Sequence, residues 1–181
     1  LGESRLRSAT HCPSNSVTAM KMDDLFPLTE REEAINALHY ATAIYTAAPV
    51  VDDLLDAVDW PRGNRRLVDP SCGDGIFLGR ALARLLRERP KVREDELLDV
   101  LQGWELHPSA AQQSRARVAE LLDDHGWEPG KARAASERMV RQADFLTAGP
   151  TGPYCHVLAG NPPYLRFTNL HQLLRAEYQA A

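Results

Sequence analysis

Apolar residues in this chain alternate between stretches with helical spacing and short continuous runs. Helical spacing is found over residues 29–42, where Thr29 and Glu32 have the pattern of a capping box at the start. A second helix is predicted over residues 51–58, because Pro49 suits a first helical turn and Pro, Gly and Asn residues follow the apolar face.

Strand-like runs alternate with helical stretches in the rest of the chain. The apolar runs that predict strands cover residues 66–69, 97–104, 139–143 and 155–159. Helices are predicted at 76–89, 108–124 and 170–178, with a charged linker after Pro90 and a loop at 128–137. Strands that alternate with helices form a parallel sheet flanked by helices, so the fold class is α/β.

Four distinctive polar residues stand where the predicted strands end. They are Asp69, Glu105, Asp144 and Asn161. Ligands of open parallel sheets bind beyond the carboxyl ends of the strands, where such residues meet. The shared position therefore predicts a single site.

The composition is typical of a soluble globular domain, with 44% hydrophobic and 25% charged residues among 181. No apolar run could span a membrane and no secretory leader is recognisable, so the cytoplasm is the expected location. The three cysteines are scattered, and we expect no metal site and no disulfide framework. The net charge of −4 is not typical of a protein that binds a nucleic-acid phosphate backbone by itself.

Residues 1–21 are polar and aperiodic, and the chain begins with Leu although Met20 and Met22 follow. We interpret residues 1–21 as a leader, either added upstream of the natural start or flexible. Residues 22–181 are then the domain.

The turn from Asp69 to Gly75 carries two glycines and leads directly into a helix. Glycine permits a positive φ and a close approach of a ligand to the backbone, and a helix amino terminus attracts anionic groups. Two glycines are equally compatible with a purely structural turn.

Acidic residues at the next two strand ends offer acceptors for a nucleoside. An acid such as Glu105 commonly accepts hydrogen bonds from ribose hydroxyls, and Asp144 with Phe145 could supply an acceptor and an aromatic face for adenine. Taken singly, an acid such as Glu105 at a strand end is more often a solvated residue, and Asp144-Phe145 alone favours a helix cap with a core side chain.

The loop Asn161-Pro162-Pro163-Tyr164 is more specific. Two consecutive prolines continue neither a strand ladder nor a helix, so the backbone is rigid. Such a loop can aim the Asn161 oxygen and the Pro162 carbonyl at an amine, while Tyr164 stacks on a planar ring.

Jointly, the turn at 69–78 and the loop at 160–164 resemble the two signature motifs of DNA adenine-N6 methyltransferases. Their order, with the cofactor motif first, is that of a group found in restriction-modification systems. Tyr45-Thr46 is similar to the upstream cofactor motif of the family, although Ala47 replaces the usual proline. The resemblance spans about residues 40–168.

The resemblance implies a Rossmann-like class I methyltransferase fold, S-adenosyl-L-methionine as cofactor, and an adenine flipped out of the duplex. The catalytic residues it implies are Asn161, Pro162, Pro163 and Tyr164. The cofactor-binding residues it implies are Tyr45, Thr46, Asp69, Pro70, Cys72, Gly73, Gly75, Glu105, Asp144 and Phe145.

The family would continue with three further strands and a recognition domain, which do not fit into the 17 residues after Tyr164. We therefore expect the amino-terminal half of such an enzyme, whether a fragment, a truncated product or one piece of a split enzyme. Double-stranded DNA would bind through a region that the chain lacks. The strand at 155–159 would then have an open edge, which predicts self-association, a partner chain or cover by the carboxyl-terminal segment.

Two other functions stay open from the sequence. The first is a methyltransferase for another planar amine, in protein glutamine or in guanine of ribosomal RNA, although the Asp-Pro-x-Cys-Gly start favours adenine. The second is a non-catalytic module that binds cofactor or docks on a partner.

Overall fold

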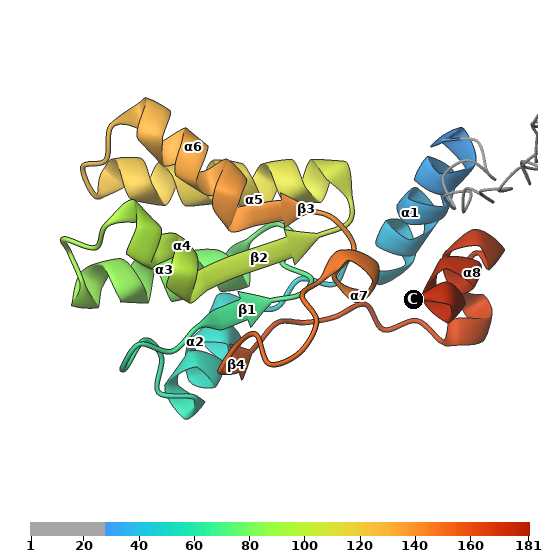
Figure 1. The fold of residues 1–181 in the computed structure, drawn as a ribbon, viewed down its shortest axis with the longest axis horizontal. Helices are drawn as coiled ribbons and strands as arrows, with labels where there is room; N and C mark the ends of the chain where they lie inside the picture. The colour runs from blue at the N-terminus through green and yellow to red at the C-terminus, as the bar shows by residue number, and fades with distance from the viewer. Residues whose placement is uncertain (1–27) are drawn as a thin grey trace, which may run out of the picture.

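The centre of the fold is a parallel sheet whose strands lie in the order β3-β2-β1-β4 (Figure 1). The structure, a computed structural model, describes residues 28–181. The strands are β1 (Leu67–Asp69), β2 (Leu101–Glu105), β3 (Val140–Gln142) and β4 (Val157–Leu158). All three pairings are parallel, which confirms the predicted α/β class with a parallel sheet.

The strand order reverses at β1. Leu67 pairs with Leu101 of β2 on one side and with Val157 of β4 on the other. In open parallel sheets this switch point opens a crevice beyond the carboxyl ends of the strands. The crevice therefore lies next to Asp69, the last residue of β1.

Helices surround the sheet. They are α1 (Leu28–Thr42), α2 (Ala48–Ala57), α3 (Ile76–Glu88), α4 (Glu94–Val100), α5 (Pro108–Asp124), α6 (Pro129–Met139), α7 (Phe145–Ala148) and α8 (Gln172–Ala180), with a 3-10 turn η2 (Phe167–Asn169). Helix α3 packs against both α2 and α5, and α6 packs against α5. The predicted helices at 76–89 and 108–124 are thereby confirmed.

The main core forms between the sheet and the apolar face of α3. Leu78, Leu82 and Leu85 follow helical spacing and are fully buried, as is Leu67 of β1. Trp60 closes this core at the end of α2, where its indole Nε1 donates a hydrogen bond to the Ala81 carbonyl at 3.0 Å. The buried indole N–H of Trp60 is thus paired with a backbone acceptor.

Helices α1 and α8 form a second, smaller unit, and Figure 1 shows them side by side at the opposite end of the molecule from α6. Buried Ala34, Leu173 and Leu174 form its core, with partly buried Leu38 and Tyr178 packed against them. The Arg31 guanidinium donates to Glu177 Oε1 at 2.8 Å, so an ion pair also joins the two helices.

Two segments differ from the sequence expectation. The stretch predicted as a loop at 128–137 is α6, whose first turn is stabilised because the Glu128 side chain accepts from the backbone N–H groups of Gly130 and Lys131. The charged linker contains α4, and the apolar run at 97–104 is divided between that helix and β2. In both cases charged residues provide the helix caps and a few apolar residues provide the buried face.

The chain ends also differ in part. Helix α1 begins at Leu28, one residue before the predicted cap Thr29, and the proposed leader at 1–21 lies outside the described residues. Strand β4 is shorter than predicted and pairs with β1, while 59% of Leu158 is exposed. Helix α8 packs against α1 and α7 rather than along β4, so self-association or a partner at this edge stays a prediction.

Candidate active site

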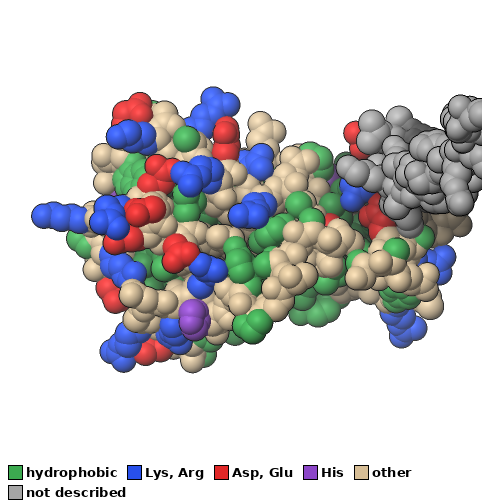
Figure 2. All heavy atoms as spheres, in the orientation of Figure 1, with side chains coloured by type: hydrophobic (Ala, Val, Ile, Leu, Met, Phe, Trp, Pro, Cys, Tyr) green, Lys and Arg blue, Asp and Glu red, His purple; other side chains and the backbone are tan. Residues whose placement is uncertain are grey.

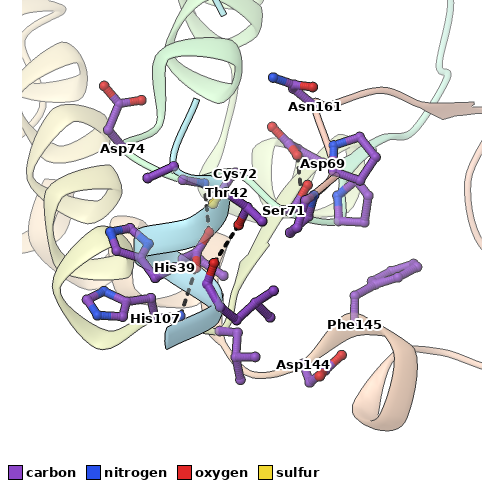
Figure 3. Close-up of a pocket in the computed structure, with 18 of the residues that line it drawn as sticks. His39, Thr42, Asp69, Ser71, Cys72, Asp74, His107, Asp144, Phe145 and Asn161 are labelled. Carbon is purple, nitrogen blue, oxygen red and sulfur yellow. Dashed lines mark hydrogen bonds between the residues drawn. The ribbon is translucent and has the colours of Figure 1, made fainter. Parts of the chain in front are cut away.

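A cavity of about 440 Å³ lies beyond the carboxyl ends of the strands, with residues of α1 as its opposite wall (Figure 3). This volume is in the range of pockets that hold nucleotide-sized ligands. Apart from Gly75 and Tyr164, every site residue named from the sequence lines this cavity. Segments separated by more than a hundred residues therefore meet at one place.

The glycine turn between β1 and α3 forms the floor. Gly73 and Gly75 both have positive φ, at 55° and 82°. A Cβ on Gly75 would lie 2.8 Å from the Ser114 Cα, and one on Gly73 would lie 3.2 Å from the ring of Tyr45. Glycine is required at Gly75 both for its conformation and for its contact with α5.

Glu105, at the end of β2, holds this turn in place. Its Oε2 accepts a hydrogen bond from the Gly73 N–H at 2.8 Å, and its Oε1 accepts from the His107 N–H at 2.7 Å. Each carboxylate oxygen retains capacity for another donor. Glu105 therefore fits an acceptor of ribose hydroxyls whose orientation is set by the backbone.

Asp69 lies beneath the cavity and is only 1% exposed. Burial raises the pKa of Asp69 to about 7, while the hydrogen bond from the Ser71 N–H, at 3.1 Å, acts in the opposite direction. A Cβ on Gly160 would overlap the Asp69 carboxylate. The residue before Asn161 must thus be small for the loop after β4 to pack against the end of β1.

Asp144 and Phe145 occupy the far side of the cavity, at the start of α7. Asp144 Oδ1 accepts from the Leu146 N–H at 2.8 Å, which makes Asp144 the cap of this short helix. The Phe145 ring meets the Trp104 ring edge-to-face, with 5.6 Å between centroids. The structure confirms that Asp144 caps a helix, whereas Phe145 is only partly buried and lines the cavity instead of entering the core.

The Asn161 side chain is held from the segment between α1 and α2. Its Nδ2 donates a hydrogen bond to the Ile44 carbonyl at 3.0 Å. This bond sets which end of the amide is available, because the donor is engaged and Oδ1 remains an acceptor. Figure 3 shows Asn161 close to Asp69 and on the opposite side of the cavity from His39 and His107.

The remaining predicted residues divide into two groups. Thr46, Pro70, Cys72, Pro162 and Pro163 line the cavity. Tyr164 directly follows Pro163 but lies outside the lining, and its side chain is 77% exposed. The structure thus places Tyr164 beside the cavity rather than within it.

The sequence reasoning missed a pair of stacked histidines in the wall. The rings of His39 and His107 lie 3.8 Å apart between centroids and are nearly parallel, at 11°. His107 Nε2 contacts Asn36 Oδ1 at 2.9 Å, and burial together with the nearby His39 lowers the pKa of His107, against the opposing effect of Glu105. His107 stands two residues after the end of a strand, and this position could have identified it as a site residue from the sequence.

Tyr178 was also missed as a site residue. It comes from α8, yet it lines the cavity and its hydroxyl contacts Asp144. No local pattern could have found it, because its helical spacing predicts only an apolar face.

Within the described residues, no group of three or more His, Cys, Asp or Glu side chains is arranged to hold a metal ion. None of the helices in that part of the chain has the length and apolar character needed to cross a membrane. Burial raises the pKa of the Cys72 thiol well above its ordinary value, and burial also raises that of Cys155. Neither thiol is therefore suited to act as a thiolate nucleophile at neutral pH.

Comparison with known proteins identifies three relatives, all type II methyltransferases. The chain is 36% identical to M.PaeR7I of Pseudomonas aeruginosa over 161 residues, which cover 84% of this chain and 28% of the relative. It is 31% identical to M.BstVI of Geobacillus stearothermophilus over 150 residues and 29% identical to M.XhoI of Xanthomonas vasicola over 148. These two matches cover 76% of this chain and 27% of each relative. No family model and no solved structure matches the chain.

The sheet, its switch point and the cavity beyond its strands define a Rossmann-like methyltransferase fold. Over most of its length the chain belongs with the type II methyltransferases of restriction-modification systems, as the motifs indicated. It spans little more than a quarter of the length of the curated relatives that it matches.

Proposed function

We propose that the chain is the cofactor-binding and catalytic-motif portion of an enzyme that transfers a methyl group from S-adenosyl-L-methionine to the N6 amine of adenine in DNA. The observation that carries the proposal is the orientation of Asn161 in the wall of a cavity that Asp69, Glu105 and Asp144 also line. The methionine end of the cofactor would lie over the glycine turn, its ribose at Glu105 and its adenine at Asp144 and Phe145.

Asn161 supplies what the amine of adenine needs. The N6 lone pair is delocalised into the ring, and acceptors for its two hydrogens localise the pair on nitrogen. Because Asn161 Nδ2 is engaged by the Ile44 carbonyl, Oδ1 is available as one acceptor, and the Pro162 carbonyl would be the second. Most of the benefit is alignment and electrostatic stabilisation in the transition state.

The cofactor, when bound, supplies an electrophilic methyl group on a sulfonium. In-line attack of the amine on this carbon would break the sulfur–methyl bond and leave the demethylated thioether, so no covalent intermediate with the protein would be needed. The raised pKa values of the Cys72 and Cys155 thiols agree with a route that uses neither cysteine as a nucleophile. The surplus proton of the methylated amine would then pass to solvent water.

DNA would be held mainly by regions beyond this chain. The net charge is −4, and Figure 2 shows positive and negative side chains interspersed at the end that carries α3 to α6. Phosphate contacts supply most of the affinity for DNA, and this surface offers no continuous basic stripe on the visible face. Tyr164, which is exposed and directly follows Pro163 of the cavity lining, would stack on the flipped adenine.

The first experiment measures cofactor binding by the 181-residue chain. Calorimetry with S-adenosylmethionine and its demethylated product should detect binding, and Glu105→Ala should weaken it by about 1.5–3 kcal/mol, the loss typical of hydrogen bonds to a charged group. Asp53→Ala is the matched control, because this acid is exposed and lies outside the cavity. Absence of binding at millimolar cofactor would contradict the proposal.

The second experiment measures chemistry. In a longer protein that contains this chain, Asn161→Ala should abolish formation of N6-methyladenine in duplex DNA and leave cofactor affinity nearly unchanged, because the lost contacts are to the amine. Mass spectrometry of the digested DNA identifies the methylated base. Transfer to protein glutamine or to guanine instead would favour the alternative substrates, and binding without transfer would favour a non-catalytic module.

A further inference from the structure

The Asp144 carboxylate is held by two donors on different segments. Its Oδ1 accepts from the Leu146 N–H at 2.8 Å, within the same turn. Its Oδ2 accepts from the Tyr178 hydroxyl at 2.6 Å, across 34 positions of sequence. Asp144 is largely buried, so each of these bonds limits how the carboxylate can rotate.

The position of Tyr178 is set by the packing of α8. Leu173 and Leu174 are buried against Ala34 of α1, and Tyr178 packs on the same cluster. The Glu177 carboxylate pairs with Arg31 one residue before Tyr178. The hydroxyl therefore reaches Asp144 from a helix that is anchored on two sides.

We infer that Tyr178 is a positioning residue that makes the cavity selective for a purine carrying a 6-amino group, because its hydroxyl fixes the Asp144 carboxylate toward that amine. The inference rests on the proposed function, in which Asp144 accepts the adenine amine of the cofactor. It adds a role for α8, which lies beyond all the motifs.

The geometry leaves Asp144 able to do this. An ionised carboxylate has about four lone-pair sites, and the two described donors use one on each oxygen. Burial and the hydrogen bond to Asp144 raise the pKa of Tyr178, so its hydroxyl stays a donor at neutral pH. The lone pairs of Asp144 that remain unused can then accept a hydrogen bond from a ligand. They favour a donor such as an amine over the carbonyl of a 6-oxo purine, which is itself an acceptor.

The experiment compares two ligands that differ at this one position. S-adenosylhomocysteine carries a 6-amino group and S-inosylhomocysteine a 6-oxo group, and calorimetry on the full 181-residue chain gives both affinities. Wild-type chain should prefer the amino ligand, and Tyr178→Phe should reduce the preference by roughly tenfold, mainly by weakening the amino ligand. Tyr154→Phe is the matched control, because its hydroxyl contacts Gln102 outside the cavity.

The outcomes are distinguishable. A reduced preference in Tyr178→Phe together with an unchanged preference in Tyr154→Phe supports the inference. An unchanged preference, or an equal loss of affinity for both ligands, overturns the inference. Tyr178 would then line the cavity without affecting its selectivity. Loss of the cooperative thermal transition in Tyr178→Phe also overturns it, since the hydroxyl would be structural. No binding of either ligand by the wild-type chain would instead reject the proposed function.

Discussion

The cavity is bordered by two regions that are built in different ways. On one side, the sheet with α3 and α5 packs around the large buried core, and its acidic side chains are oriented by backbone N–H groups. On the other side, α1 and α8 come from opposite ends of the described chain and share a small core and one ion pair.

The difference concerns how each region resists change. A residue of the main core packs against the sheet and several helices, so truncating its side chain should destabilise the whole domain. The α1–α8 pair has few buried side chains, so it can open locally while the sheet stays folded. We expect the sheet to provide stability and fixed acceptors, and the helical pair to complete the cavity.

The largest effect is expected for Gly75→Ala in the turn. The φ of 82° and the approach to the Ser114 backbone should together cost roughly 2–5 kcal/mol of unfolding free energy. Gly126→Ala is the control, because its φ is 83° and no atom lies within 4 Å of the added carbon. Chemical denaturation measures the unfolding free energy of both variants. Equal losses of unfolding free energy would show that the contact with α5 adds nothing to the cost of Gly75→Ala.

Leu174→Ala should open the helical pair and leave the sheet intact. Truncating a fully buried leucine usually costs about 2–5 kcal/mol, but here we expect the loss to be confined to the smaller unit. Hydrogen exchange should become faster in α1 and α8 and stay unchanged in β1 and β2. Leu82→Ala, in the main core, should instead increase exchange in the sheet. If hydrogen exchange became faster in both regions in each variant, the two regions would unfold as one unit.

Asp69→Asn tests a buried acid of the main region. The folded-state pKa of about 7 exceeds the ordinary value of 3.8, so the folded state binds more protons between these values. The stability that Asp69 contributes to the wild-type chain should therefore fall as the pH rises from about 4 to 7. The neutral amide removes this dependence, and its thermal midpoint at pH 8 should exceed that of wild type by at least about 3 °C. Equal midpoints at pH 8 would contradict the burial argument.

The smallest effect is expected at the histidine pair, where the two regions meet. The pKa of His107 is lowered, so at this residue the unfolded state binds more protons below about 6.5, and the stability that His107 contributes falls as the pH decreases through that range. His39→Phe keeps a stacked ring and removes the like charge, so the His107 pKa should rise but stay below its ordinary value, because burial remains. NMR titration measures the pKa of His107 in this variant. A further decrease of that pKa would contradict the proposed repulsion by His39.

Some features of the fold were predictable because they depend on local patterns. The helix over 76–89 follows from its apolar spacing, and β1 follows from a short apolar run that ends in Asp69. Helices α4 and α6 were not predicted, because each buries a few small or scattered apolar residues behind charged caps. Their helical state is decided by contacts with β2 and α5, which no local window contains.

The sequence by itself determined which polar residues stand at the carboxyl ends of the strands. Since parallel strands present those ends at one edge, Asp69, Glu105 and Asp144 had to converge. Only the tertiary structure decided that Ile44 orients Asn161, that Gly160 packs on Asp69, and that Tyr178 reaches Asp144. These contacts join residues 34 to 117 positions apart, and their geometry depends on how whole helices pack rather than on the spacing of any motif.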